Sequence, residues 1–267
     1  MSLPLSVLDL APVPAGVSAS VAVRRTVELA RHAEALGYVR VWYAEHHAMP
    51  AVASSAPEIL ISSSAAATTR IRLGAGGIML PNHAPLKVAE AFHTLEALYP
   101  GRIDLGLGRA PGGVPGASRA LRAVRGELFP QLVDELLACS RGAGDAPPRF
   151  DAIHAEPGDA GLPPIWLLGS SGASARYAGE AGFGYSFAAH FSTAPAAPPM
   201  LAYRESFKPS AAFARPHAIL GVAAICAETD AQARELASTM ELFWLRIQRG
   251  EFTPLPSVAE ALAYPYS

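Results

Sequence analysis

The sequence is poor in charged side chains, and arginine carries almost all of its positive charge. Charged residues make up 16% of the 267 positions and hydrophobic residues 51%, which excludes a disordered or fibrous chain and favours a compact globular protein. Lysine occurs only at Lys87 and Lys208, which we attribute to coding bias. The formal net charge is -2, so the composition gives no reason to expect nucleic acid or an anionic membrane as a partner.

Cysteine and long apolar runs are also scarce. Cys139 and Cys226 are far apart and lie in apolar surroundings, so we expect two free, buried thiols and no disulfide. The amino-terminal segment lacks the basic start and the uninterrupted apolar run of a signal peptide. No run of about eighteen apolar residues is present that could span a bilayer. We therefore expect a cytoplasmic protein.

Short apolar runs alternate with alanine-rich stretches of helical period along the whole chain. The expected strands lie in residues 5–11, 38–44, 71–80, 102–108, 164–169, 184–189 and 218–226. The expected helices lie in residues 21–36, 57–68, 85–98, 129–140, 173–181, 200–207 and 231–249. Helix ends are expected at Gly37, Gly101, Gly142, Gly182 and Gly250, since glycine tolerates the left-handed conformation that closes a helix.

Repeated strand and helix alternation leaves two architectures, an open doubly wound sheet and a closed α/β barrel. We prefer a TIM-type barrel, because polar and glycine-rich residues follow five of the expected strands, whereas an open sheet would concentrate them near one switch point. The chain is then a single barrel domain over residues 1–267. A segment rich in Gly, Pro and Asp at about residues 143–163 is expected to be a surface insertion.

Polar residues cluster where the expected strands end, which is the edge where a parallel barrel builds its active site. They are Glu45, His46 and His47 after the second strand, Pro81, Asn82 and His83 after the third, Arg109 after the fourth, Gly169, Ser170 and Ser171 after the fifth, and His190 after the sixth.

The sequence GSSGAS, residues 169–174, turns from an apolar strand into a helix. Backbone amides, the helix dipole and three hydroxyl groups there suit a phosphate, although an ordinary serine cap fits the same residues. Arg109 favours the phosphate interpretation, because a guanidinium beside this turn could grip a phosphate at two points.

His46 and His47 are adjacent, so they point to opposite faces of an extended chain and cannot both face one ligand. Neither HExxH nor a cysteine and histidine zinc spacing occurs, and we expect no metal. His46 could exchange a proton near neutral pH, although a structural role remains open for it. The dinucleotide fingerprint, the P-loop and the hydrolase GxSxG elbow are all absent.

Four motifs together carry a family likeness. EHH after the second strand, LGAGGIMLPNHAPLKVAE around the third, GRIDLGLGRAPG at the fourth and WLLGSSGASA at the fifth make the chain similar to the bacterial luciferase-like flavin-dependent monooxygenases. This resemblance covers about residues 5–266. It implies a TIM-type barrel that binds FMN, usually delivered as reduced flavin by a separate reductase. Reduced flavin then reacts with O2 to give a C4a-peroxyflavin, which oxidises an aldehyde or another small organic substrate.

The same resemblance implies roles for individual residues. The phosphate would be held by Arg109, Gly169, Ser170, Ser171 and Ser174. His46 would act as acid or base near the flavin, and Gly76 and Gly77 would be joined by a non-prolyl cis peptide under its ring. Gly108 falls where luciferase has a reactive cysteine, so light emission is not predicted.

The resemblance also leaves questions open. Members of the family usually continue for about another helix, strand and helix, so the chain is expected to form a barrel that lacks the eighth strand and final helix. A dehydrogenase or reductase that uses the deazaflavin F420 remains an alternative, and so does a non-catalytic flavin-binding protein. A homodimer through the helices after the second and third strands is expected by family likeness.

Overall fold

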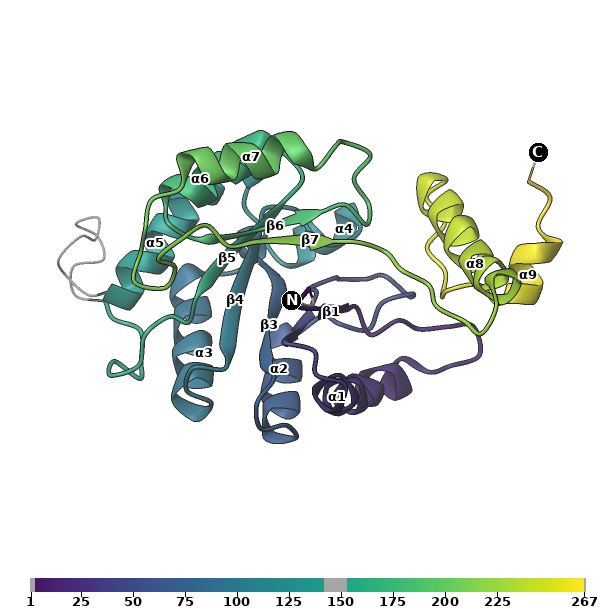
Figure 1. Cartoon of the computed structure of the whole chain (residues 1–267), viewed down its shortest axis with the longest axis horizontal. Coiled ribbons are helices and arrows are strands. Elements are labelled where there is room, and N and C mark those ends of the chain that lie inside the picture. The colour runs from purple at the N-terminus through teal and green to yellow at the C-terminus, as the bar shows by residue number, and fades with distance from the viewer. Residues whose placement is uncertain (1–2, 142–152, 267) are drawn as a thin grey trace.

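Seven parallel strands form the centre of the protein. The computed structural model describes residues 3–141 and 153–266. Its strands are β1 Ser6–Asp9, β2 Arg40–Tyr43, β3 Arg72–Met79, β4 Ile103–Gly108, β5 Ile165–Gly169, β6 Gly184–Ala188 and β7 Ala218–Gly221. Each pairs with the next one in chain order, and among the described residues β1 and β7 do not pair with each other. The sheet is therefore a nearly closed barrel (Figure 1).

Helices follow most of the strands, and most of those that precede β7 in the chain cover the outside of the sheet (Figure 1). They are α1 Ala19–Ala35, α2 Pro57–Ala66, α3 Pro85–Leu98, α4 Pro115–Ala120, α5 Phe129–Arg141, α6 Gly172–Glu180, α7 Ala197–Ser206, α8 Asp230–Gln248 and α9 Val258–Ala263, with short 3-10 turns η1 Leu80–Asn82 and η2 Gly126–Leu128. Within the described ranges, none of the helices is long and apolar enough to cross a membrane.

Local sequence signals account for the ends of several helices. Ser18 caps α1 by accepting from the amide of Val21, and Thr229 caps α8 by accepting from the amide of Gln232 at 3.2 Å. Four of the glycines expected to end helices have positive φ, which confirms those predictions; they are Gly37, Gly101, Gly182 and Gly250. The fifth, Gly142, lies outside the described residues.

The core has an outer and an inner part. The outer part packs between the sheet and the helices and includes Leu73, Leu105 and Phe92. A smaller cluster of Trp42, Trp166 and Phe213 forms the inner part. Large aromatic side chains therefore fill the inside of the barrel, as expected for a packed barrel rather than a pore.

Asp104 is fully buried near the amino-terminal edge of the barrel. Its carboxylate accepts from Arg40 Nε at 3.1 Å, from Trp42 Nε1 at 3.2 Å and from Arg72 Nη2 at 2.6 Å. The Arg40 guanidinium also lies 4.8 Å from the ring centroid of Trp166. This buried cluster therefore joins β2 to β5 at the edge opposite the predicted site.

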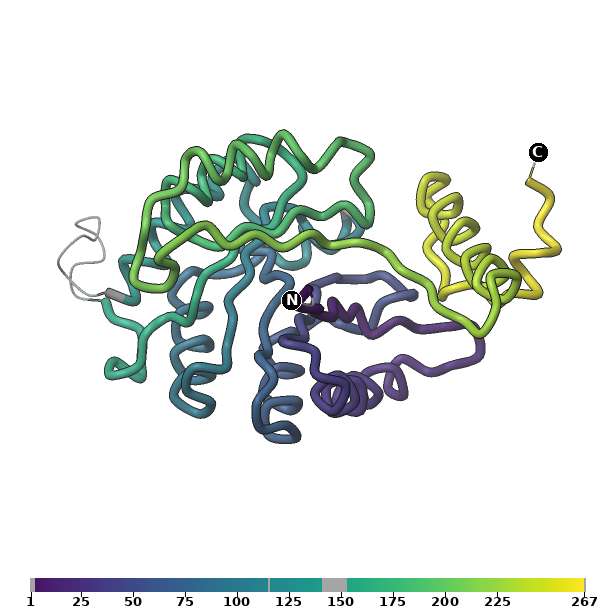
Figure 2. Tube along the Cα trace, in the orientation of Figure 1, coloured from purple at the N-terminus to yellow at the C-terminus, as the bar shows by residue number. Residues whose placement is uncertain are grey.

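The helices α8 and α9 lie together beside the open side of the barrel, as the yellow-green end of the trace in Figure 2 shows. Leu255, which precedes α9, connects them to the segment after β1. Its amide donates to Val13 O at 2.9 Å, and its carbonyl accepts from the amide of Ala15 at 2.8 Å.

One sequence prediction needs correction, and another lies partly outside the described residues. Cys139 is buried as expected, but Cys226 is exposed, because β7 ends at Gly221 instead of running to residue 226. In the part of the chain that the structure describes, no strand pairs with the far side of β7 to cover the apolar run that continues it, and Val222 is 63% exposed. Of the insertion expected at residues 143–163, residues 143–152 lie outside the described ranges. The rest, residues 153–163, contains no strand or helix.

Candidate functional site

The predicted site residues lie at the carboxyl ends of the strands. His46 and His47 follow β2, Asn82 closes η1 after β3, and Arg109 follows β4 directly. The serines lie between β5 and the first turn of α6, and His190 follows β6. Parallel strands bring these ends to one edge of the barrel.

Glu45 is a fully buried carboxylate at the centre of this edge. Its Oε1 accepts from His47 Nε2 at 2.8 Å, from His83 Nε2 at 2.9 Å and from Asn82 Nδ2 at 3.1 Å. Its Oε2 accepts from the amide of Met79 at 2.9 Å. The buried charge is therefore compensated by hydrogen bonds from two loops.

These partners set the pKa of both Glu45 and His83. Burial would raise the pKa of Glu45, but the hydrogen bonds from His83, His47 and the Met79 amide outweigh burial and lower this pKa below its ordinary value. The hydrogen bond to Glu45 raises the pKa of His83 above its ordinary value, against the opposing effect of burial. Both shifts favour a carboxylate that faces an imidazolium.

The loop after β4 is tied into the same cluster. Asn82 Nδ2 also donates to Pro111 O at 3.1 Å, and the amide of His47 donates to Gly112 O at 2.7 Å. Gly112 has φ +64, and a Cβ there would lie 2.8 Å from Glu45 O, so only glycine fits this close approach. The imidazoles bond directly to the carboxylate, and no group of three or more His, Cys, Asp or Glu residues in the described ranges could hold a metal ion.

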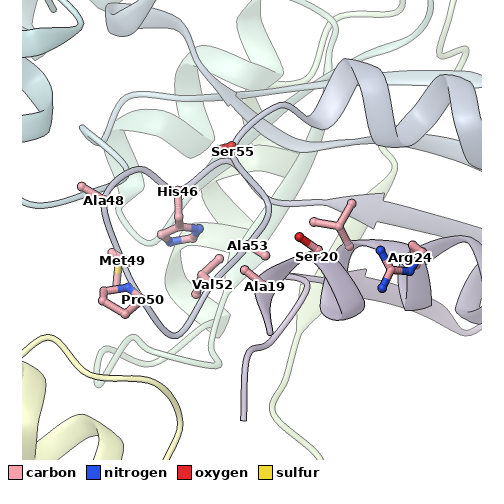
Figure 3. A pocket seen from close by; sticks show the side chains of 11 residues that line it. Ala19, Ser20, Arg24, His46, Ala48, Met49, Pro50, Val52, Ala53 and Ser55 are labelled. Atoms are coloured by element: carbon pink, nitrogen blue, oxygen red, sulfur yellow. The ribbon is translucent and has the colours of Figure 1, made fainter. Parts of the chain in front are cut away.

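His46 points away from this cluster into a cavity of about 720 Å³ (Figure 3). Its amide donates to Ser54 O at 2.9 Å, which fixes the backbone. Its Nδ1 atom is buried and makes no hydrogen bond to any described residue. A buried polar atom without a partner is where a bound group or a proton would complete the hydrogen bonding.

The surroundings of His46 favour the neutral imidazole. Burial is the main cause that lowers the pKa of His46, and the charges of His47 and His190 lower it further, whereas Glu45 opposes them. Burial also lowers the pKa of His190, against a hydrogen bond with the backbone of Gly221. A neutral imidazole can accept a proton at one nitrogen and donate at the other.

Arg109 lies beside the turn between β5 and α6. Leu107 of β4 pairs with Leu167 of β5, so Arg109 and Gly169 are each two residues beyond that pair, on neighbouring strands about 5 Å apart. The Arg109 side chain is exposed, lies against Gly126, and makes no hydrogen bond or ion pair with a described residue. Its donors are therefore available to a bound anion.

The serines of this turn present hydroxyl groups and amides. Ser171 is the N-cap of α6, and no side chain among the described residues caps the helix. Ser174 Oγ donates to Ser171 O at 2.9 Å and lies 3.3 Å from Ser171 Oγ. Tyr185 Oη bonds the carbonyls of Gly169 and Ser171, both at 3.4 Å, which holds the turn in place. Ser170 follows Gly169 directly and is partly exposed.

Gly76 and Gly77 are joined by a cis peptide bond, as the family resemblance implied. The pairing of β3 with β4 shifts register between Ala75 and Ile78, on either side of this pair. A Cβ on Gly77 would lie 2.7 Å from Gly106 O, so the backbone packing requires glycine. Of the residues expected to bind a cofactor, Gly76 and Gly77 thus lie on β3, and the others lie at the ends of β4 and β5 or in the first turn of α6. His46 lies separately after β2.

Gly108, at the end of β4, packs against Met79. A Cβ at Gly108 would lie 2.7 Å from Met79 Sδ. A cysteine would fit at this position only if the methionine moved, because the overlap is well below van der Waals contact.

Sequence reasoning named Glu45, Asn82 and His83 as residues at strand ends but gave them no role. The sequence did contain a signal for this cluster, because a carboxylate and two histidines at neighbouring strand ends can form an ion pair. Ser20 and Arg24 of α1, which also line the His46 cavity, gave no signal, because their helical spacing is that of any exposed helix face.

Comparisons with known proteins show the family of the chain. The sequence profile described as Luciferase-like monooxygenase matches residues 3–263. A luciferase-like monooxygenase of Escherichia coli strain K12 is 45% identical over 259 residues, which cover 94% of this chain and 75% of that protein. An N-acetyl-S-alkylcysteine monooxygenase of Bacillus subtilis strain 168 is 42% identical over 187 residues, which cover 69% of this chain and 56% of that protein.

A solved structure shares the whole architecture. The crystal structure of apo-MsnO8 superposes with a TM-score of 0.86 at 40% identity and covers 97% of this chain and 77% of that chain. The chain therefore belongs to the luciferase-like monooxygenase family.

Proposed function

We propose that the protein is an FMN-dependent monooxygenase that uses reduced FMN and O2 to oxidise a small organic substrate. A separate reductase supplies the reduced flavin. One observation carries this proposal. The Arg109 guanidinium, at the end of β4, lies beside the uncapped first turn of α6, which follows β5, so that anion donors from two neighbouring strand ends come together.

Arg109, Ser170 and Ser171 would hold the phosphate of FMN. A guanidinium can bond two phosphate oxygens at once, and the first-turn amides of α6 add donors and the positive end of the helix dipole. Gly169 keeps the turn compact, because a Cβ there would lie 2.3 Å from Ser174 Oγ. These residues suit a dianionic headgroup, so FMN fits them better than an uncharged flavin does.

The ring of FMN would lie along β3, next to Gly76 and Gly77, where the chain carries no side chains. When bound in reduced form, FMN would supply two electrons to O2, so that one oxygen atom enters the substrate and the other leaves as water. His46 would hold or move a proton at Nδ1, the atom that makes no bond to a described residue.

Glu45 would keep this arrangement in place. Glu45 does not itself line the cavity, and its bonds to His47 and His83 hold the loop that carries His46 against the loop after β3. Glu45 is thus a positioning residue rather than a catalytic one.

The substrate would be an apolar molecule with an oxidisable atom, such as an aldehyde or a thioether. A cavity of about 720 Å³ is large enough for such a molecule. The name of the Bacillus subtilis relative, an N-acetyl-S-alkylcysteine monooxygenase, supports sulfur compounds as the first to test.

A reaction with isotopically labelled O2 tests the proposal. The protein is mixed with chemically reduced FMN and either N-acetyl-S-benzylcysteine or a long-chain aldehyde, and products are analysed by mass spectrometry. We expect one labelled oxygen atom in the product. If reduced FMN is oxidised at its free rate and no product forms, the proposal fails. A parallel titration with F420 tests the dehydrogenase alternative, and tight FMN binding without any turnover would support a non-catalytic flavin-binding protein.

We also propose a homodimer that forms through α2 and α3. Ile59 of α2 is 62% exposed and Leu98 of α3 is 59% exposed, so apolar side chains are available on both helices. Light scattering coupled to size-exclusion chromatography measures the mass directly. A monomer at every protein concentration would contradict this proposal.

A further inference from the structure

The cavity beside His46 has a second wall, which is made by the first turns of α1 (Figure 3). Seven of its eleven lining residues are apolar; they are Ala19, Val23, Ala48, Met49, Pro50, Val52 and Ala53. Ser20 and Ser55 contribute hydroxyl groups, and His46 and Arg24 complete the lining. The lining therefore combines apolar side chains with polar groups at two separate places.

Arg24 is the only lining residue with a fixed charge, and no carboxylate lines the cavity. Its guanidinium makes no hydrogen bond or ion pair with any residue in the described ranges. Burial favours the neutral form of His46, so Arg24 is the main source of charge in the cavity. An anion in this cavity would meet a cation with no competing acid.

The amino end of α1 strengthens this positive character. Ser20 and Arg24 are four residues apart, so they lie on one face of the helix, and Ala19 and Ser20 belong to its first turn. Ser18 caps the amide of Val21, whereas no side chain among the described residues caps the amides of Ala19 and Ser20. Ala19 and Ser20, which carry free amides at the positive end of the helix dipole, thus line the same cavity as Arg24.

The two polar places are separated by apolar surface. Val52, Ala53 and Ala19 line the cavity between His46 and Arg24, whereas Met49 lies on the other side of His46 (Figure 3). A ligand that spans the cavity would therefore have an apolar body, one end near His46 and the other end near Arg24.

We infer that Arg24 and Ser20 recognise a carboxylate at the end of the substrate remote from the atom that is oxidised. This inference rests on the proposed function only for the statement that the substrate is oxidised at the end near His46. A planar guanidinium bonds both oxygens of a carboxylate, and the Ser20 hydroxyl can donate one more hydrogen bond. Arg24 is then a specificity residue, which fixes the orientation of the substrate.

A matched pair of ligands tests the inference. N-acetyl-S-benzylcysteine and its primary amide have the same size and differ in the charge of the group that Arg24 would bind. Calorimetry measures the binding of each to the protein without flavin, and kcat and KM are measured with reduced FMN and O2. The variants are Arg24→Ala, Arg24→Lys and, as a control on the same helix, Arg25→Ala, which removes an exposed arginine that does not line the cavity.

The unsubstituted protein should prefer the carboxylate to the amide by about tenfold and no more, because Arg24 is exposed to water, which screens the charge. Arg24→Ala should abolish this preference and raise KM with little change in kcat, as expected for the loss of uniform binding. Arg24→Lys should keep part of the preference, and Arg25→Ala should keep all of it. Arg24→Ala should also leave the affinities for FMN and riboflavin unchanged, which separates this site from the proposed phosphate site.

Two failures can be told apart. If the carboxylate is preferred in binding but no oxygenated product forms, the proposed function fails and the recognition site stands. If product forms but both ligands behave alike in the protein and in Arg24→Ala, the recognition site fails and the proposed function stands. The inference would also be overturned if the carboxylate did not bind at millimolar concentration, or if Arg25→Ala reduced the preference for the carboxylate as much as Arg24→Ala.

Discussion

His83 Nε2 lies 2.9 Å from each of the two carboxylate oxygens of Glu45, and both groups are at the edge where the strands end. The residues are 38 positions apart in the sequence, at the ends of neighbouring strands. Because the carboxylate is fully buried, this contact couples the loops after β2 and β3 to the electrostatics of the barrel mouth.

Glu45→Gln should lower the free energy of unfolding by about 2 kcal/mol, because a neutral amide leaves buried donors without the charged acceptor they face. Urea denaturation followed by circular dichroism measures this loss. Glu28→Gln, on the exposed side of α1, is the matched control and should change stability by less than about 0.5 kcal/mol. Equal effects of the two substitutions would contradict the central position of Glu45.

The contribution of His83 to stability should depend on pH. Its folded pKa is raised above the unfolded value, so its stabilising effect is complete below about pH 6.5 and is lost as the pH rises through the folded pKa. Glu45 has a lowered folded pKa, so its own contribution is lost as the pH falls through that pKa. The difference in unfolding free energy between the protein and His83→Gln should therefore be larger near pH 6 than near pH 9.

Measurement of that difference by urea titration at a series of pH values checks the sign. The same series for His32→Gln, which removes an exposed histidine of α1, is subtracted as a control. A difference that grows with increasing pH would show that His83 does not pair with the carboxylate as an imidazolium.

Asp104→Asn should destabilise the protein without affecting the site. The carboxylate is fully buried and neutralises Arg40 and Arg72, so its loss leaves buried positive charge and should cost about 3 kcal/mol. Asp104 lies at the opposite edge of the barrel from Arg109, at the other end of β4. Affinity for FMN, measured where the variant is folded, should therefore stay within about twofold. A large loss of FMN affinity would contradict the separation of the two edges.

The fold could be predicted from the sequence to a large extent. All seven expected strands and all seven expected helices are present, because nearly continuous apolar runs and glycine helix ends are local signals. The short helices α4 and α9 were not predicted, since six residues are too few to show a helical period. The exposure of Cys226 could not be predicted either, because it depends on whether a neighbouring strand covers the end of β7.

The candidate site was predictable in its residue types but not in its contacts. Arg109, His46 and the serines are at strand ends, where barrel topology alone brings them to one edge. The Glu45 carboxylate accepts hydrogen bonds from His47, His83 and Asn82. These bonds depend on the conformation of three loops, which local sequence does not determine. The part of α1 that lines the cavity was missed because tertiary packing, not helical periodicity, brings Arg24 to the loop of His46.

The central claim is that Arg109 and the first turn of α6 hold the phosphate of FMN. Flavin fluorescence titrations with FMN and with riboflavin, which lacks the phosphate, test it in the protein, in Arg109→Ala and in the exposed control Arg204→Ala. Arg109→Ala should weaken FMN binding by about tenfold to a hundredfold and riboflavin binding by less than about twofold, and Arg204→Ala should change neither. Equal losses for FMN and riboflavin in Arg109→Ala, or no loss for either, would contradict the claim.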